Sequence, residues 1–181
     1  MTSAGYLLFE TAVGTCGLAW NADGAIRAVQ LPEHTEASTR MRLQRRSSDA
    51  VESMAPPESI RTAITRIRGL LSGVRDDLRD LPLDLNGVPP FYQAVYAIAR
   101  RIPVGQTLTY GELATQLDEP GAARAVGQAL GRNPIPIVIP CHRILAATGN
   151  GGFSAHGGVN TKRRLLAIEG ARLDGGQLRL L

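Results

Sequence analysis

The sequence predicts two domains, an α/β N-terminal domain over residues 1–87 and a mainly helical C-terminal domain over residues 88–181 that contains a helix-turn-helix. Three observations predict this division. Short apolar runs with strand character accompany helical periodicity in the first half, whereas two short helices flank a Pro-Gly break in the second. Between the halves lies "NGVPP" at residues 86–90, a turn-forming stretch typical of a domain boundary.

The first residues predict short strands. Strands are expected for "YLLFETAVG" and for the two arms of "CGLAWNADGAIRAVQL", which a turn at residues 21–24 joins. The next segment, "TEASTRMRLQRR", predicts a helix over residues 35–46. Residues 46–59 are polar and contain proline, so they predict a loop.

The end of the first half predicts one more helix and one more strand. Ile60, Ile64, Ile67 and Leu71 recur at helical spacing, so a helix is expected over residues 59–72, ended by Gly73. The segment "LPLDL" that follows predicts a further strand.

The second half begins with the helix "PFYQAVYAIARRI", which closes at Pro103. Thr109 and Glu112 then form a capping box for a helix over about residues 110–117. After the break "DEPG", Pro120 suits the first position of a second helix, which Gly131 and Pro134 end. Two short helices around a tight turn are typical of a helix-turn-helix.

The second of these helices has one apolar face and one face with few side chains able to read bases. Ala122, Val126, Ala129 and Leu130 share the expected core side. The opposite side carries the stripe Arg124, Gln128 and Arg132, flanked by Ala123, Gly127 and Gly131. Small residues suit a close approach of the backbone to a ligand, with Arg124 as a projecting side chain. The alternative is an ordinary amphipathic helix with solvated arginines.

Charge is distributed unevenly along the chain. Residues 1–87 hold 10 Lys+Arg and 11 Asp+Glu, a net of −1, while residues 88–181 hold 10 and 5, a net of +5. The second half is therefore the candidate surface for a polyanion such as nucleic acid. No apolar run reaches the roughly 18 residues of a membrane span, and the N-terminus does not read as a signal peptide, so we expect a cytoplasmic protein.

The two cysteines lie in different surroundings. Cys16 sits in the strand pattern "TCGLAW" and is expected to be a core residue. Cys141 ends the apolar run of "IPIVIPCHRI" and is followed by His142 and Arg143, two cations that favour the thiolate anion. We expect Cys141 to be a nucleophile. The histidines and cysteines show no close pair at zinc-type spacing, so no metal site is expected.

Two further residues stand out beside the cysteine. Asn133 ends the second helix of the pair, where a helix C-cap is the ordinary interpretation. Glu169 ends the helix "TKRRLLAIEG", which Asn160 caps and Gly170 closes. An acid in the last turn opposes the helix dipole. A specific partner compensates such a residue, and an imidazole is the obvious choice; a tolerated surface glutamate is the alternative.

These motifs resemble a known family. "NPIPIVIPCHRI", "TYGELA", "ARAVGQALGRNP" and "KRRLLAIEG" resemble, in the same order, segments of the O6-alkylguanine-DNA alkyltransferases, also called methylated-DNA–protein-cysteine methyltransferases. The resemblance covers roughly residues 88–172. It implies a ribonuclease H-like N-terminal domain and a monomer that binds duplex DNA in the minor groove. It implies no cofactor.

The resemblance also implies a mechanism. The damaged base is flipped out of the duplex, and Cys141 takes the alkyl group of O6-alkylguanine in a single turnover. O4-alkylthymine is a second candidate substrate. Arg124 fills the vacated space, while Tyr110 acts on the neighbouring phosphate. Glu169 orients His142, which deprotonates Cys141 through water.

The implied site residues fall into three sets. The catalytic set is Cys141, His142, Glu169 and Asn133, with Asn133 bracing the turn. The DNA-binding set is Tyr110, Ala123, Arg124, Gly127, Gln128 and Arg143. The substrate-pocket set is Tyr110, Ile144, Phe153 and Ser154.

The loop after the cysteine departs from the family pattern. A Tyr-Ser-Gly-Gly-like segment is expected there, but the chain reads "GFSAHGG", with Phe153 in place of a tyrosine and two added residues. Three other classes compete with this interpretation. A non-catalytic lesion-binding relative lacks the cysteine, a helix-turn-helix regulator needs more base-reading side chains, and a cysteine hydrolase gives no reason for the helix pair.

Overall fold

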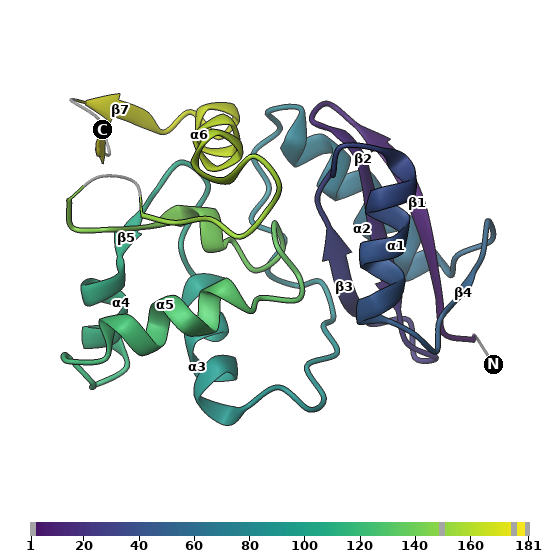
Figure 1. Ribbon diagram of the computed structural model, residues 1–181, viewed down its shortest axis with the longest axis horizontal. Helices are drawn as coiled ribbons and strands as arrows, with labels where there is room; N and C mark the ends of the chain where they lie inside the picture. The colour runs from purple at the N-terminus through teal and green to yellow at the C-terminus, as the bar shows by residue number, and fades with distance from the viewer. Residues whose placement is uncertain (1–2, 149–150, 175–176, 180–181) are drawn as a thin grey trace. The chain divides into compact units, whose positions relative to one another are not determined.

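The computed structural model describes residues 3–148, 151–174 and 177–179 (Figure 1). The chain forms two compact units, Met1–Asn86 together with Pro134–Val138, and Gly87–Asn133 together with Ile139–Leu181. The second unit begins within the "NGVPP" stretch. The short segment Pro134–Val138 belongs to the first unit, although the sequence predicted an unbroken second domain.

A four-stranded sheet forms the centre of the first unit. Its strands are β1 (Gly5–Thr11), β2 (Gly14–Trp20), β3 (Ile26–Gln30) and β4 (Val51–Glu52), in the order β3-β2-β1-β4. The first three are the predicted strands and pair as antiparallel neighbours, and β4 runs parallel to β1. The predicted loop 46–59 therefore contains a two-residue strand. The predicted strand "LPLDL" is wrong, because only an isolated bridge joins Ile26 and Leu83.

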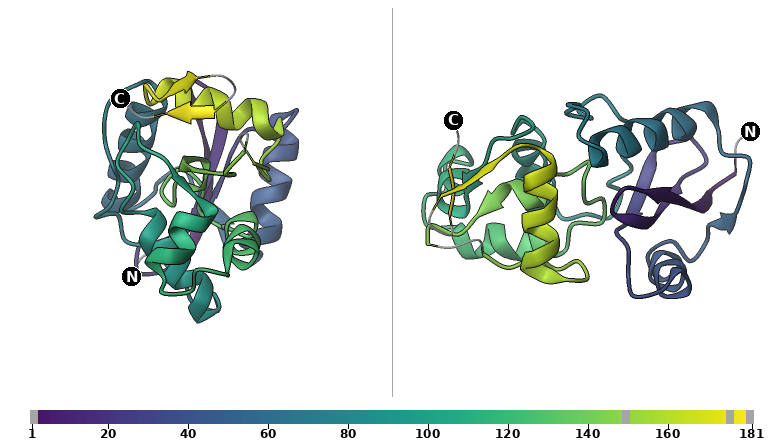
Figure 2. Two further views of the ribbon diagram at one scale, coloured as in Figure 1. Left: turned by 90° about the vertical axis from the view of Figure 1, so that its left-hand side faces the viewer. Right: turned by 90° about the horizontal axis from the view of Figure 1, so that it is seen from above.

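Two helices cover opposite faces of this sheet (Figure 2). The helix α1 (Glu36–Arg46) packs Leu43 onto Tyr6, Ala19 and Ala28. The helix α2 (Glu58–Leu71) lies on the other face, and its predicted apolar stripe is buried. Alternate residues of each strand point to opposite faces, so both faces are apolar.

The second unit contains four α-helices in the described residues. They are α3 (Pro90–Ala99), α4 (Tyr110–Gln116), α5 (Ala123–Gly131) and α6 (Gly158–Ile168). Short strands β5 (Leu108–Thr109) and β6 (Ile144–Leu145) pair in parallel, and β7 (Arg172–Asp174) pairs with β8 (Gln177–Arg179), a hairpin the sequence did not predict.

Helix starts are where local prediction was least accurate. The capping box at Thr109 and Glu112 is present, as predicted. The next helix begins at Ala123 and not at Pro120, because residues before it form a turn in which Asp118 adopts φ 60° and Ala122 N–H bonds to Glu119 O. Asn160 does not cap α6, which begins two residues earlier after Gly157 at φ 83°.

Candidate active site

A buried turn presents Cys141 at the start of a 3-10 helix, η1 (Cys141–Arg143). Before it, Ile137 has φ 75°, a left-handed conformation that is strained for a β-branched residue. The Asn133 side chain donates from Nδ2 to the Ile139 carbonyl at 2.8 Å. Asn133 therefore closes the turn that leads to the cysteine, and the predicted helix-ending role belongs to Gly131 and to Arg132, the C-cap of α5.

Parallel pairing of β5 and β6 brings the start of α4 to the cysteine segment. Leu108 pairs with Ile144 and Thr109 with Leu145, so Tyr110, which follows β5, and η1, which precedes β6, are separated only by the length of this two-residue pairing. Tyr110 is the first residue of α4. Residues about thirty positions apart thus become neighbours through two short strands.

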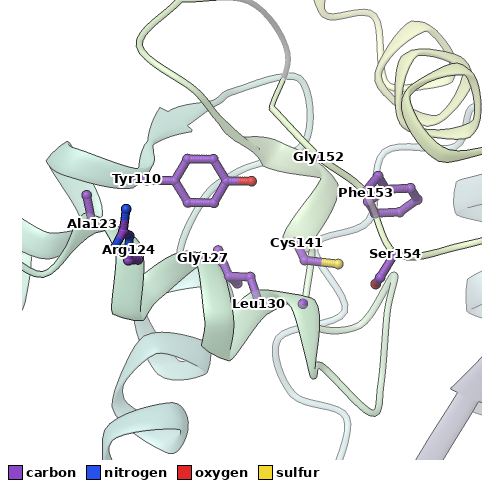
Figure 3. Close-up of a pocket in the computed structure, with 10 residues that line it drawn as sticks. Tyr110, Ala123, Arg124, Gly127, Leu130, Cys141, Gly152, Phe153 and Ser154 are labelled. Carbon is purple, nitrogen blue, oxygen red and sulfur yellow. The ribbon is translucent and has the colours of Figure 1, made fainter.

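A pocket of about 610 Å³ opens beside Cys141 (Figure 3). Its lining residues come from α4, α5, η1 and the segment before α6: Tyr110, Ala123, Arg124, Gly127, Leu130, Gly131, Cys141, Gly152, Phe153 and Ser154. The sulfur of Cys141 points to the side where Phe153 and Ser154 lie. Both α5 glycines leave room for a ligand to approach the backbone.

A buried ionic network lies behind the cysteine. His142 Nε2 is 2.8 Å from Glu169 Oε1, and both side chains are almost fully buried. Because a carboxylate only accepts hydrogen bonds, Nε2 carries the proton and Nδ1 is the basic nitrogen. The Nδ1 atom is buried and has no hydrogen-bond partner among the described protein atoms. The imidazole partner predicted for Glu169 is therefore His142.

Arg143 holds the other side of the same carboxylate. Its Nε donates to Glu169 Oε2 at 2.9 Å and its Nη2 to Oε1 at 2.8 Å, while Nη1 donates to the Ile102 carbonyl at 2.6 Å. Burial raises the pKa of Glu169, but the charges and hydrogen bonds of His142 and Arg143 outweigh it and lower that pKa to about 2. Glu169 is therefore ionised throughout the neutral range.

The thiol of Cys141 is subject to opposing effects. Burial is the largest effect and raises the pKa of Cys141 above its ordinary value, although a hydrogen bond from the Asn133 side chain, the charge of Lys162 and the backbone N–H groups of Cys141 and His142 act to lower it. Cys16 lacks such support: burial raises its pKa to about 12, and only Thr11 opposes this. Burial therefore raises the pKa of both thiols, and the two cysteines differ in the groups that oppose this effect; the side chains of His142 and Arg143, expected to favour the thiolate, are not among those groups.

Comparison with known proteins places this site in a family. The model "6-O-methylguanine DNA methyltransferase, DNA binding domain" matches residues 90–171. A methylated-DNA–protein-cysteine methyltransferase of Mycobacterium tuberculosis is 37% identical over 153 residues, 83% of this chain and 90% of the relative. The chain belongs to the methylated-DNA–protein-cysteine methyltransferase family. A Methanothermobacter thermautotrophicus member is 36% identical over 159 residues, 88% of this chain and 81% of that protein.

Solved structures of the family share the fold. The crystal structure of Mycobacterium tuberculosis OGT in complex with DNA has a TM-score of 0.73 at 32% identity, covering 91% of this chain and 92% of that one. The O6-methylguanine-DNA methyltransferase from Pyrococcus kodakaraensis has a TM-score of 0.70 at 28% identity, covering 92% and 99%. The likeness therefore extends over both units, including the first, where the sequence motifs are weaker.

The structure assembles most of the residues that the family resemblance implied. Tyr110, Ala123, Arg124, Gly127, Cys141, Phe153 and Ser154 all line the pocket. Gln128 is exposed on α5 but does not line it. The pocket also includes Leu130, Gly131 and Gly152, which the sequence did not single out.

Two predicted placements are wrong. Arg143 was expected on the DNA side, yet only 1% of it is exposed and its guanidinium is bound to Glu169. Ile144 was expected in the substrate pocket, but it is fully buried in β6 and is not among the pocket residues. Both side chains follow a reactive residue in sequence, and the tight turn of η1 directs them into the core.

Sequence reasoning also missed Lys162, whose side chain is fully buried and whose Nζ contacts the carbonyl of Gly152, a pocket residue. Within a basic run on α6 it is indistinguishable by pattern from its exposed neighbours Arg163 and Arg164. Among the residues the structure describes, no group of three or more His, Cys, Asp or Glu gathers as a metal site. No helix in that part of the chain is both long and apolar enough to cross a bilayer.

Proposed function

We propose that this family member repairs duplex DNA by direct reversal, transferring the alkyl group of O6-alkylguanine to Sγ of Cys141 once per molecule. The observation that carries the proposal is the combination of a thiol opening to a pocket with a buried Glu169–His142 pair directly behind it. Burying a charged group costs roughly several kcal/mol. A protein that only binds DNA would have no reason to bury this ionic network behind a thiol.

The chemistry follows from the positions of the groups. His142 Nδ1 accepts the thiol proton through water, while Glu169 stabilises the imidazolium that forms. The thiolate then attacks the alkyl carbon, forming the C–S bond as the bond from carbon to O6 breaks. The electron pair of that bond stays on guanine, which takes up a proton. The thioether is stable, so the reaction needs no cofactor and ends after one turnover.

The second unit would supply the DNA interface. In this proposal α4 and α5 act as a helix-turn-helix in the minor groove, with small residues at Ala123 and Gly127 allowing close approach. Arg124 fills the space of the flipped base, and Tyr110 acts on the neighbouring phosphate. Figure 3 supports this, since Tyr110 and Arg124 lie on one side of the pocket and Cys141 on the other.

Several finer points belong to the same proposal. The first unit has a ribonuclease H-like topology, supported by the order β3-β2-β1-β4 with β4 parallel to β1. Residues 1–87 serve as the N-terminal domain and residues 88–181 as the DNA-binding and alkyl-acceptor domain. The protein acts as a cytoplasmic monomer, and O4-alkylthymine is a second candidate substrate.

Intact-protein mass spectrometry tests the proposal. The protein is incubated with duplex DNA containing O6-methylguanine, and peptides are then mapped. We expect one added methyl group on Cys141, none with undamaged duplex and none in Cys141→Ser. Tight, lesion-selective binding without a mass change would instead indicate a non-catalytic lesion-binding protein. Repeated product release per molecule would indicate a hydrolase.

A second experiment tests the interface. Binding to duplex DNA is expected to weaken steeply with salt, because arginines displace condensed counterions. Arg124→Ala is expected to slow alkyl transfer without changing the free energy of unfolding, because the side chain is exposed. Salt-independent binding would contradict the placement of the interface on the basic second unit.

A further inference from the structure

Lys162 is an unusual residue both in the sequence and in the fold. It is the only lysine in the chain, whose other basic residues among the 20 Lys+Arg are all arginines. It lies on α6 with none of its surface exposed. The one lysine of the chain is therefore a buried residue.

The contacts of Lys162 leave its charge uncompensated. Its Nζ donates to the Ile144 carbonyl at 2.6 Å and approaches the Gly152 carbonyl at 3.4 Å. It also lies 5.8 Å from the centre of the Tyr110 ring. Among the described residues no carboxylate bonds to it. Buried ammonium groups are normally paired, because an isolated charge in the interior is costly.

The other charged groups near Lys162 are either bonded to other residues or exposed to solvent. On α6 and η1, Glu169 is held by His142 and Arg143, and on α4 Glu112 caps its own helix. On α6 itself, Arg163 and Arg164 are exposed. The remaining titratable groups that face Lys162 are Tyr110 and Cys141. Tyr110 and Gly152 both line the pocket that Cys141 lines, so the ammonium contacts two residues of the wall of that pocket.

We propose that Lys162 is the counter-charge of the Cys141 thiolate, so that the buried ammonium and the buried sulfur anion stabilise each other. Lys162 is a positioning residue, since it acts on the reaction through Cys141. Its carbonyl contacts fix the ammonium beneath the pocket wall formed by Gly152. The inference extends the role that the sequence assigned to His142 and Arg143, whose side chains are turned to Glu169 instead.

The electrostatic surroundings of both groups are consistent with this pairing. Burial lowers the pKa of Lys162 to about 8, and the negative charge of Cys141 opposes that fall. Burial raises the pKa of Cys141, and the positive charge of Lys162 opposes that rise. Arginine could not replace this lysine freely, because its planar fork needs more acceptors than two carbonyls provide.

The pairing has a consequence for the alkylated protein. The inference rests on the proposed function only in taking Cys141 as the alkyl acceptor. Once the sulfur becomes a neutral thioether, Lys162 loses its partner and must release its proton at lower pH. By linkage, the ammonium lowers the pKa of Cys141 by the same amount as the thiolate raises the pKa of Lys162, because both shifts measure one interaction energy.

The single lysine makes a direct test possible. Protein labelled with ¹³C-lysine gives one ε-carbon signal, whose pH titration reports the ionisation of Lys162 alone. We expect the midpoint to lie at lower pH in Cys141→Ser than in the unchanged protein, and also lower after chemical S-methylation of Cys141 with iodomethane. Identical midpoints would overturn the proposal, because the two groups would then not interact.

A complementary test follows the cysteine. The rate at which iodoacetamide modifies Cys141 is measured against pH in Lys162→Met, in Lys162→Arg and in the control Arg163→Met, an exposed neighbour on α6. We expect Lys162→Met to move the rise in rate to higher pH, about tenfold slower at pH 7 for each unit of thiol pKa. Arg163→Met should match the unchanged protein, and an unshifted profile in folded Lys162→Met would contradict us.

Circular dichroism shows whether Lys162→Met is folded. If it is not, the lysine signal of the unchanged protein and of Cys141→Ser decides the question. Neither experiment contains DNA, so the outcome is separate from that of the alkyl-transfer assay. A shifted lysine midpoint in a protein that fails to dealkylate DNA would keep this inference and overturn the proposed function.

Discussion

The two units of the chain bury different kinds of polar side chain. In the described part of the first unit the buried polar residues are uncharged: Gln30, Thr39 and Ser47. In the second unit they are mostly ionisable: Asn133, His142, Arg143, Lys162 and Glu169. Because each buried charge is costly, a fold built for stability alone would resemble the first unit. The second unit contains a set of charges that chemistry at Cys141 explains.

The surroundings of the two cysteine sulfur atoms differ in the same way. Both are buried, but Cys16 lies in β2 with a threonine beside it, whereas Cys141 faces a pocket. Burial alone keeps a thiol protonated and inert. The comparison teaches that a reactive cysteine is identified by the groups that stabilise its anion and not by its exposure.

The largest expected effect is on alkyl transfer, which should depend entirely on Cys141 and not at all on Cys16. Cys141→Ser is expected to abolish alkyl transfer from O6-methylguanine in duplex DNA, whereas Cys16→Ala should keep it and lose about 1 kcal/mol of stability through a small cavity. Mass spectrometry of the protein after one exposure to substrate measures transfer. An adduct on Cys16, or transfer by Cys141→Ser, would break the comparison.

The buried ion pair of Glu169 and the partly solvated ion pair of Asp76 should contribute differently to the loss of stability at acid pH. Glu169 has a pKa depressed to about 2 from 4.5, so its stabilisation is complete above pH 4.5 and is lost as the pH falls toward 2. By linkage the folded protein should lose about 2 kcal/mol from this group between pH 5 and pH 3. Urea unfolding at both pH values measures the loss.

Two substitutions sharpen that result. Glu169→Gln should be less stable at pH 7 by about 3–5 kcal/mol, because it leaves Arg143 buried without its counter-charge, and should lose less on acidification. The matched control is Asp76→Asn. Arg66 lowers the pKa of Asp76, but the pair is partly solvated, so the change should stay below about 1 kcal/mol. Equal acid sensitivity in both variants would contradict this expectation.

Glycine-to-alanine exchanges should distinguish a packed surface from an open one. At Gly17 a Cβ atom would lie 2.7 Å from Leu43 Cδ2 in the buried core between sheet and α1, so Gly17→Ala should cost about 1–3 kcal/mol. At Gly127 the nearest atom is Tyr110 Cε1 at 3.8 Å, an ordinary contact. Gly127→Ala should therefore gain about 0.5–1 kcal/mol of helix stability. Thermal unfolding measures both, and equal losses would show that α5 is packed as tightly as the sheet.

The smallest effect compares two helix caps. Thr109 accepts from Glu112 N–H at 3.1 Å, and Glu112 returns a bond to the Thr109 N–H. Thr35 accepts from Ser38 N–H at 3.1 Å without such a return bond. Replacing each threonine with alanine should cost about 1 kcal/mol at Thr109 and about 0.5 kcal/mol at Thr35. Hydrogen exchange of the first-turn amides measures each helix separately, and a larger effect at Thr35 would oppose this order.

Local sequence signals determined much of the fold. Strand alternation predicted β1, β2 and β3, helical spacing predicted α2, and the capping box predicted the start of α4. Errors occurred where several conformations satisfy the same residues. Pro120 lies in a turn instead of opening a helix, and "LPLDL" has strand character but only one bridge to the sheet.

The motif around Cys141 determined the family and named most of the pocket. The sequence also identified Glu169 as an acid in need of a partner, because its position opposed the helix dipole. These conclusions depend on residue type and position along the chain, which the sequence states directly. They needed no knowledge of which way a side chain points.

Only the tertiary structure decided which cation serves which anion. Arg143 adjoins the cysteine in sequence, yet it bonds Glu169, 26 residues away. Lys162 looks like one of three basic residues on a helix surface, yet it donates to Ile144, 18 residues away. Electrostatic partnership depends on distance in space and on burial, and both arise from the pairing of β5 with β6 and the packing of α6 on η1. A pattern along the chain carries neither quantity.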